Sequence, residues 1–235
     1  MAGSGDTLKK ARREKRPWTV GHKVGAVAAA FAVGCLPTAR IVTRLVTGRS
    51  ITTMGTGQPG ASNVKHSVGT KAGEAVFVGD VVKGLLPAVA GRVAGADPDT
   101  VGMMAIAPIA AHILVVGGRG AATGLGAISV WDPLATSVLV APVLAVGGLL
   151  KQHAASVVVC YVLWAPARRL LGRSSPCQIV QGVGWGAMMM AARLRGPRRG
   201  AAQASPRVLW QRLVWDREAA PVAGGAVPDA EATSE

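Results

Sequence analysis

The chain has little charge, few aromatic residues and only three cysteines. Of its 235 residues 16% are charged and 4% aromatic, whereas 50% are hydrophobic. So little charge argues against a soluble globular domain. So few aromatic residues leave no stacking platform for bases, so we exclude nucleic acid as a partner despite a net charge of +14. Cys35, Cys160 and Cys177 lack metal-ligand and disulfide spacing, and we interpret them as small buried hydrophobes.

Long apolar segments dominate what is present. They are rich in Ala, Val, Leu and in the 31 glycines, a composition that suits closely packed spanning helices. A span needs about 20 residues, so this length allows about six or seven. The apolar segments lie at about 20–42 with a break at Pro37, 72–94, 101–116, 134–150 and 154–171, with a shorter one at 178–192. We predict an all-α integral membrane protein of about six or seven transmembrane helices with glycine-rich cytoplasmic loops.

Charge divides the chain into three parts. Residues 1–18 form a basic tail that we expect to be disordered, 19–194 a multi-span membrane domain, and 195–235 a second disordered tail. The basic tail indicates a cytoplasmic N-terminus, but the polar connection at 43–71 is also basic. The positive-inside rule therefore leaves the orientation open. Four tryptophans near segment ends are typical of an interfacial belt: Trp18, Trp131, Trp164 and Trp185.

Asp80 and Lys83 lie inside an apolar segment, directly after a glycine-rich loop. A charged side chain at the centre of a spanning helix costs about 2.5–3.5 kcal/mol on insertion scales. At a spacing of i,i+3 the two share one helix face, so each offsets the other's charge. A buried ion pair beside many backbone N–H groups indicates a site for a charged, phosphate-bearing ligand.

The loop before this pair formally matches a dinucleotide-binding fingerprint, with glycines at 55, 57 and 60 and Asp80 at the distance of a ribose-binding acid. We reject that interpretation, because the fingerprint needs a strand and a βαβ unit. A flexible surface linker is the alternative. Against a linker stand Pro59, Ser62 and Asn63, which add turn rigidity and hydrogen-bonding groups.

A second glycine-rich turn, Gly117–Gly120, includes Arg119. Glycines let a backbone approach an anion, a following helix N-terminus points N–H groups at it, and Arg adds a fork of donors. A tight interhelical turn with one snorkelling Arg is the alternative. His112 stands five residues earlier. No His is followed five residues later by Asp, which argues against acyltransferases that use a His–Asp pair.

Four segments stand in a fixed order and carry a family resemblance. They are Gly34-Cys-Leu-Pro37-Thr38, then Gly55-Thr-Gly57-Gln-Pro59-Gly60-Ala61-Ser62-Asn63-Val64, then Ala72-Gly73 with Asp80-Val-Val-Lys83-Gly84, and His112 with Gly117-Gly118-Arg119-Gly120-Ala121-Ala122-Thr123. Over about residues 24–171 the chain resembles the bacterial acyl-phosphate–glycerol-3-phosphate acyltransferases, the PlsY family.

Some residues depart from the family's motifs. Thr56 stands for Ser, Gln58 for Asn, and Arg119 for Lys. A third motif is represented by Arg169-Leu170-Leu171, with Leu163 and Pro166 where the family has His and Asn. The chain is therefore similar to a divergent member.

The resemblance implies transfer of an acyl group from acyl phosphate to the 1-hydroxyl of glycerol 3-phosphate, giving lysophosphatidic acid. Acyl phosphate, glycerol 3-phosphate and the lipid bilayer are the implied partners, with no cofactor and no metal ion. The implied location is the plasma (inner) membrane, multi-pass, with the active site facing the cytoplasm. The implied catalytic residues are Arg119, Lys83 and His112, and the implied substrate-binding residues are Gly55, Thr56, Gly57, Gln58, Gly60, Ser62, Asn63, Asp80, Gly117, Gly118, Gly120 and Thr123.

Two other functions stay open. A catalytically degenerate member could serve as a membrane scaffold or lipid-binding subunit, which the weak third motif favours. A small transporter or channel could use Asp80 and Lys83 as a relay, although the glycine turns give it little support.

Overall fold

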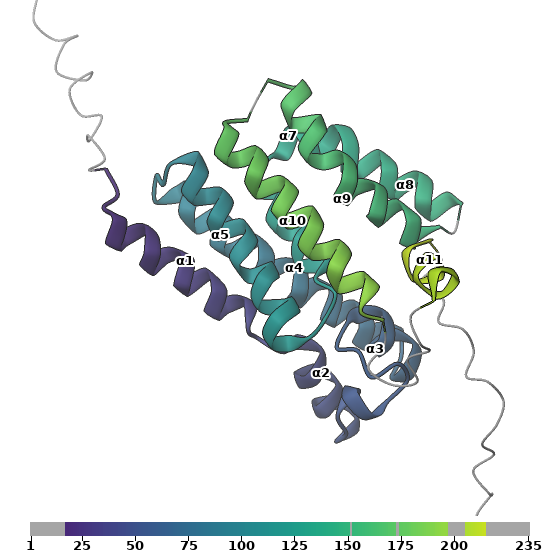
Figure 1. The fold of residues 1–235 in the computed structure, drawn as a ribbon. Coiled ribbons are helices and arrows are strands. Elements are labelled where there is room, and N and C mark those ends of the chain that lie inside the picture. Colours follow the sequence, from purple (N-terminus) through teal and green to yellow (C-terminus); the bar gives the residue numbers. More distant parts are fainter. Residues whose placement is uncertain (1–16, 151, 173, 197–204, 215–235) are drawn as a thin grey trace, which may run out of the picture.

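A computed structural model describes residues 17–150, 152–172, 174–196 and 205–214, and every regular element in these ranges is a helix (Figure 1). The all-α prediction is confirmed for this part of the chain. Helix α1 (Val20–Gly34) lies on one flank of the bundle, and α8 (Ala141–Leu149) lies on the other. Residues 1–16, most of the predicted N-terminal tail, lie outside the described residues.

The first apolar segment breaks at Pro37, as its sequence predicts. Proline lacks an N–H group and clashes with the preceding turn, so α1 ends at Gly34 and α2 (Thr38–Thr47) begins after Pro37. The connection that follows contains a 3₁₀ turn, Ile51–Thr53, and helix α3 (Ala61–Ser67). This polar connection also contributes to the core, because Ile51 and Val64 are fully buried against α2 and α4.

Helices α4 (Thr70–Val93) and α6 (Ala121–Trp131) lie in backbone contact. A Cβ at Gly84 would lie 2.0 Å from Thr123 O, and a Cβ at Gly126 would lie 2.0 Å from Val81 O. Only glycine permits that approach. The contact fixes the centre of α4, where the charged pair lies, against the first turn of α6.

Helix α5 (Pro98–Ala111) precedes the second glycine turn and ends in a π turn, His112–Val116. A π turn adds a residue to a helical turn and is frequent at functional sites. Beyond α6, the helix breaks at Asp132-Pro133. Asp132 Oδ1 accepts from Ala135 N at 3.1 Å and caps the short α7 (Pro133–Ala135). A π turn, Thr136–Val140, joins α7 to α8.

The C-terminal half adds α9 (His153–Leu170), α10 (Pro176–Leu194) and α11 (Pro206–Val214). Helix α11 contradicts the expectation of disorder throughout 195–235. Two hydrogen bonds join it to the end of α10. Arg212 donates to Leu194 O at 3.0 Å, and Arg193 donates to Arg212 O at 3.0 Å. Residues 197–204 and 215–235 of the predicted tail lie outside the described residues.

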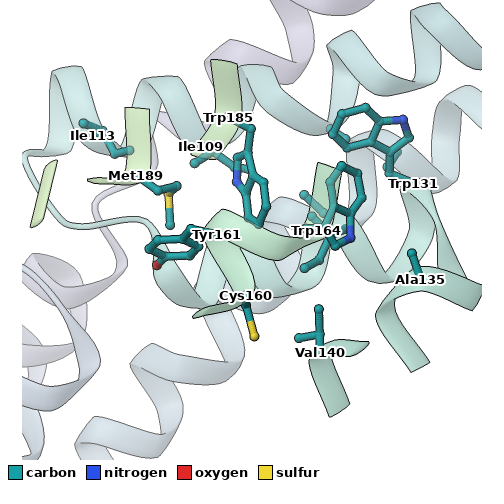
Figure 2. Packing of buried hydrophobic residues seen from close by; sticks show 14 of the residues in the cluster. Ile109, Ile113, Trp131, Ala135, Val140, Cys160, Tyr161, Trp164, Trp185 and Met189 are labelled. Carbon is teal, nitrogen blue, oxygen red and sulfur yellow. The ribbon is translucent and has the colours of Figure 1, made fainter. Parts of the chain in front are cut away.

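The aromatic residues form a core rather than a belt (Figure 2). Trp131, Trp164 and Trp185 are 4%, 0% and 1% exposed. The Trp164 ring centroid lies 4.5 Å from that of Trp131 and 5.3 Å from that of Trp185. The interfacial interpretation is therefore wrong for these three, because neighbouring helices cover them. Of the cysteines, Cys160 is buried as predicted, Cys35 is half-buried and Cys177 is exposed.

In the described part of the chain, two helical stretches are long and apolar enough to cross a membrane by length and composition alone. They are Val20–Thr47 and Pro98–Val116. Ala121–Trp131 and Pro133–Leu149 are apolar but shorter. Helix α4, with 24 residues, is longer than these last two apolar stretches, but it carries Asp80 and Lys83 in its middle.

Candidate active site

A cluster of three buried polar side chains lies where α4 meets the end of α5. Asp80, Lys83 and His112 are 3%, 2% and 2% exposed. Lys83 Nζ lies 2.8 Å from Asp80 Oδ1 and 2.7 Å from His112 Nδ1. The prediction that Asp80 and Lys83 interact is confirmed. His112, 29 residues further on, joins them through tertiary packing.

The segment around Pro37 completes this cluster. Leu36 O accepts from Lys83 Nζ at 3.0 Å, and Thr38 Oγ1 donates to Asp80 Oδ1. The break at Pro37 allows both contacts, because it frees the Leu36 carbonyl from the helix ladder and starts α2 at Thr38. All three donors of Lys83 therefore have partners within the protein. Leu36 and Thr38 belong to the first motif segment, 34–38, but neither was among the predicted site residues.

These contacts determine the hydrogen-bonding role of His112. Since the Lys83 ammonium donates to Nδ1, we assign the ring proton to Nε2. Nε2 lies against the second glycine turn, because a Cβ added to Gly118 would be only 2.0 Å from it. His112 therefore presents an N–H donor to the turn. In this tautomer Nε2 carries the proton and Lys83 occupies the lone pair of Nδ1, so neither nitrogen is available to take a proton from a substrate.

The two glycine loops meet at Gly118. A Cβ there would also lie 2.8 Å from Pro59 O, which belongs to the first loop. Gly117 and Gly120 adopt left-handed conformations, with φ of 81° and 77°, that favour glycine. The predicted loops, about 60 residues apart in the sequence, thus lie side by side over His112 Nε2.

Asn63 holds the first loop in shape. Its Nδ2 donates to Met54 O at 3.2 Å and Gln58 O at 3.0 Å, while its Oδ1 accepts from Thr56 N at 3.1 Å. Gly55, with a φ of 51°, lies so close that a Cβ would be 2.3 Å from Asn63 Oδ1. Asn63 thus stabilises the loop in this conformation through hydrogen bonds to its backbone.

Few backbone donors of the loops are free in this conformation. Gly117 N and Gly118 N both donate to His112 O, at 2.9 and 3.1 Å. In the first loop Gly57 N donates to Met54 O and Gly60 N to Gln58 O. Four of the six glycine N–H groups that we predicted to cradle a phosphate are therefore engaged within the loops.

The first turn of α6 offers the donors that the loops lack. Within the described residues no side chain caps its N-terminus, which follows Gly120. The hydroxyl of Thr123 in that turn is buried without a hydrogen-bond partner among the described residues. An uncapped helix start attracts anions through its N–H groups and its dipole. Arg119, half-buried, stands two residues before this helix.

The remaining predicted substrate-binding residues lie at the rim of the first loop. Ser62 is exposed on α3, and Thr56 Oγ1 accepts from Gln58 N at 3.4 Å. Gln58 Nε2 donates to Gly196 O at 2.6 Å, which ties the loop to the end of α10.

The end of α9 is far from this site. Arg168 Nε donates to Asp132 Oδ2 at 2.8 Å, and Asp132 directly follows α6. Eleven residues of helix, about 16 Å, separate that point from the second glycine turn. Arg169-Leu170-Leu171 therefore lies away from the two glycine loops. The end of α10, reached by Gln58, lies there instead.

Comparison with known proteins identifies the family of this chain. A family model described as glycerol-3-phosphate acyltransferase matches residues 24–195. The chain belongs to this family. The match extends past the predicted limit at 171 to include α10.

The sequences of relatives in this family align with part of the chain. A glycerol-3-phosphate acyltransferase of Halorhodospira halophila is 32% identical over 152 residues, 60% of this chain and 77% of that protein. One from Anaeromyxobacter dehalogenans is 39% identical over 118 residues, 46% of this chain and 59% of that protein.

A solved structure shares the fold. It is the glycerol 3-phosphate form of PlsY (YgiH), an integral membrane glycerol 3-phosphate acyltransferase. Its TM-score is 0.64 at 22% identity, over 73% of this chain and 88% of that one. This family member thus has the fold of an integral membrane protein.

Proposed function

We propose that this protein transfers an acyl group from acyl phosphate to the 1-hydroxyl of glycerol 3-phosphate, giving lysophosphatidic acid. Family membership and the names of the relatives support the acceptor. The hydroxyl oxygen bonds to the acyl carbon, the bond from that carbon to the phosphate oxygen breaks, and phosphate leaves with the proton lost by the hydroxyl. Acyl phosphate is already activated, so the protein mainly holds two phosphates in register and stabilises the leaving group.

One observation carries the proposal: His112 Nε2 lies under the junction of the two glycine loops, beside the uncapped start of α6. Lys83 and Asp80 hold the ring with Nε2–H outward. In this proposal His112 donates a hydrogen bond to a phosphate oxygen rather than removing a proton. Lys83 positions His112, because its own donors are engaged.

Arg119 supplies charge in this proposal. The leaving phosphate gains negative charge as the acyl–oxygen bond breaks, and a guanidinium at the second glycine turn stabilises it. The N–H groups of the first turn of α6 add to that stabilisation.

We further propose a multi-pass protein of the plasma membrane with both glycine loops facing the cytoplasm, where phosphorylated substrates are made. Six or seven spans fit the helices. The stretches are α1–α2, α4, α5 with its π turn, α6, α7–α8, α9 and α10. Helix α6, at about 16 Å, is shorter than a hydrocarbon core of about 30 Å, so the count is six without α6 and seven with it.

The test is phosphate release from acyl phosphate that depends on added glycerol 3-phosphate, with purified protein. Arg119→Ala should lower turnover by about 10²–10³-fold, the effect of losing one preorganised donor. Arg119→Lys should recover much of the lost turnover, since the motif of the family has Lys at this position. Arg169→Ala, the same change at the far end of the bundle, should leave turnover unchanged. No release by wild-type protein would favour the scaffold or lipid-binding hypothesis. Equal rates for wild type and Arg119→Ala would remove Arg119 from the site.

A further inference from the structure

The first turn of α2 carries a residue that the sequence patterns did not single out. Arg40 Nη2 donates to Val116 O at 3.3 Å across 76 residues of sequence. Val116 is the last residue before the second glycine turn. Arg40 therefore approaches that turn from the α2 side, and Arg119 lies within the turn itself.

The hydrogen bonding of Arg40 is incomplete. Its Nε atom is buried and has no hydrogen-bond partner among the described residues. No carboxylate in the described part of the chain forms an ion pair with it. A guanidinium carries five N–H donors in a rigid fork that matches phosphate geometry. One weak contact to a carbonyl oxygen leaves most of that capacity unused.

Charge at the site also calls for an anion. Asp80 and Lys83 compensate each other at 2.8 Å. Arg40 adds a positive charge beside the second glycine turn that no carboxylate among the described residues compensates. A phosphate monoester carries up to two negative charges near neutral pH, and the uncapped start of α6 favours the same ligand.

We propose that Arg40 is a phosphate-binding residue of this site, paired with Arg119 across the second glycine turn. The ligand chemistry is a dianionic phosphate group, carried by either substrate. Only one part of the assignment rests on the proposed function, namely which substrate carries that phosphate. Binding of free inorganic phosphate tests it without turnover.

Arg44 provides a matched control, because it lies on the same helix one turn later and is exposed. Full-length wild type, Arg40→Met, Arg40→Lys and Arg44→Met are purified in detergent. The first measurement is the rise in Tm caused by inorganic phosphate. We expect Arg40→Met to lose most of this rise, Arg40→Lys to keep part of it, and Arg44→Met to match wild type.

The second measurement is KM, varied separately for glycerol 3-phosphate and acyl phosphate. Losing a charge-assisted hydrogen bond should raise KM about 10–100-fold for the substrate whose phosphate Arg40 holds. The substrate whose KM rises is the one whose phosphate Arg40 holds. If Arg40→Met does not fold, Arg40→Lys decides, because a Lys cannot reproduce the fork and its KM must exceed that of wild type.

Three outcomes separate the hypotheses. If Arg40→Met lowers the basal Tm but keeps the phosphate-dependent rise and both KM values, Arg40 merely caps the π turn and the proposal is overturned. If phosphate stabilises none of the four proteins and no KM changes, it is equally overturned. If wild type has no acyltransferase activity but phosphate raises its Tm through Arg40, the proposed function fails and the phosphate site stands.

Discussion

Replacing Lys83 alone should destabilise the protein more than replacing it together with Asp80. The side chains of Lys83 and Asp80 are only 2% and 4% exposed, and their charged atoms lie 2.8 Å apart. Lys83→Met leaves the Asp80 carboxylate buried with one remaining hydrogen-bond donor among the described residues, the Thr38 hydroxyl. The double variant Asp80→Asn with Lys83→Met removes the charge as well, and its amide oxygen can still accept from Thr38.

The magnitude follows from what the two variants share. Both leave Leu36 O and His112 Nδ1 without the Lys83 donor. They differ only at residue 80, where the single variant keeps a buried carboxylate that has lost its Lys83 partner. Breaking a buried pair costs about 3–5 kcal/mol, and residues in contact couple by about 0.5–3 kcal/mol. We expect the single variant to be less stable by about 2 kcal/mol, a Tm lower by about 4–8 °C for a chain of this size.

Thermal unfolding in detergent, with Asp80→Asn to complete the cycle, measures the coupling. Lys23→Met is the matched control: Lys23 lies at the same 2.8 Å from Asp97, but the two side chains are 42% and 41% exposed. Exposed pairs contribute about 0–1 kcal/mol, so this change should be small. Strictly additive losses for Asp80 and Lys83 would refute a coupled buried pair.

Three further predictions concern the turn, the topology and pH. Gly118→Ala should abolish turnover, because its Cβ would lie 2.0 Å from His112 Nε2; activity near wild type would show that the loops are not fixed there. Single cysteines at Thr56 and Ala121, in a chain without its native cysteines, should resist an impermeant thiol reagent on intact cells; ready labelling of either contradicts the cytoplasmic site. The hydrogen bond from Lys23, with the Thr100 contacts, holds the pKa of the Asp97 carboxyl well below its usual range. The stability from that carboxylate is present above pH about 4 and is lost as pH falls, so Asp97→Asn should show a smaller loss of Tm below pH 4 than wild type. Equal losses in both proteins would rule that contribution out.

The local features of the site could be read from the sequence. Asp80 and Lys83 interact because a spacing of three residues is enough to place them on one helix face. The break at Pro37 follows from the chemistry of proline, and the left-handed turns fall on glycines. These features depend on neighbouring residues along the chain, so an apolar helix with a charged pair between two glycine loops could be predicted.

The contacts that make the site could not be read in the same way. Thr38 reaches Asp80 across 42 residues, and Arg40 reaches Val116 across 76. Nothing in the local sequence distinguishes Arg40, half-buried at the turn, from Arg44, exposed one turn later. The position of Arg169-Leu170-Leu171 away from the loops has the same cause, since the packing of α9 and α10 decides which helix end lies beside the loops.

The sequence by itself determined the helices, their breaks, the buried charged pair and the family. Only the tertiary structure decided which apolar faces meet protein, as the buried Trp164 and Trp185 show. The physical reason is that lipid and protein interior are both apolar. A membrane helix therefore carries the same hydrophobic signal on the side that packs as on the side that faces lipid. Close contact is set by shape instead, as where Gly84 lets α4 reach α6.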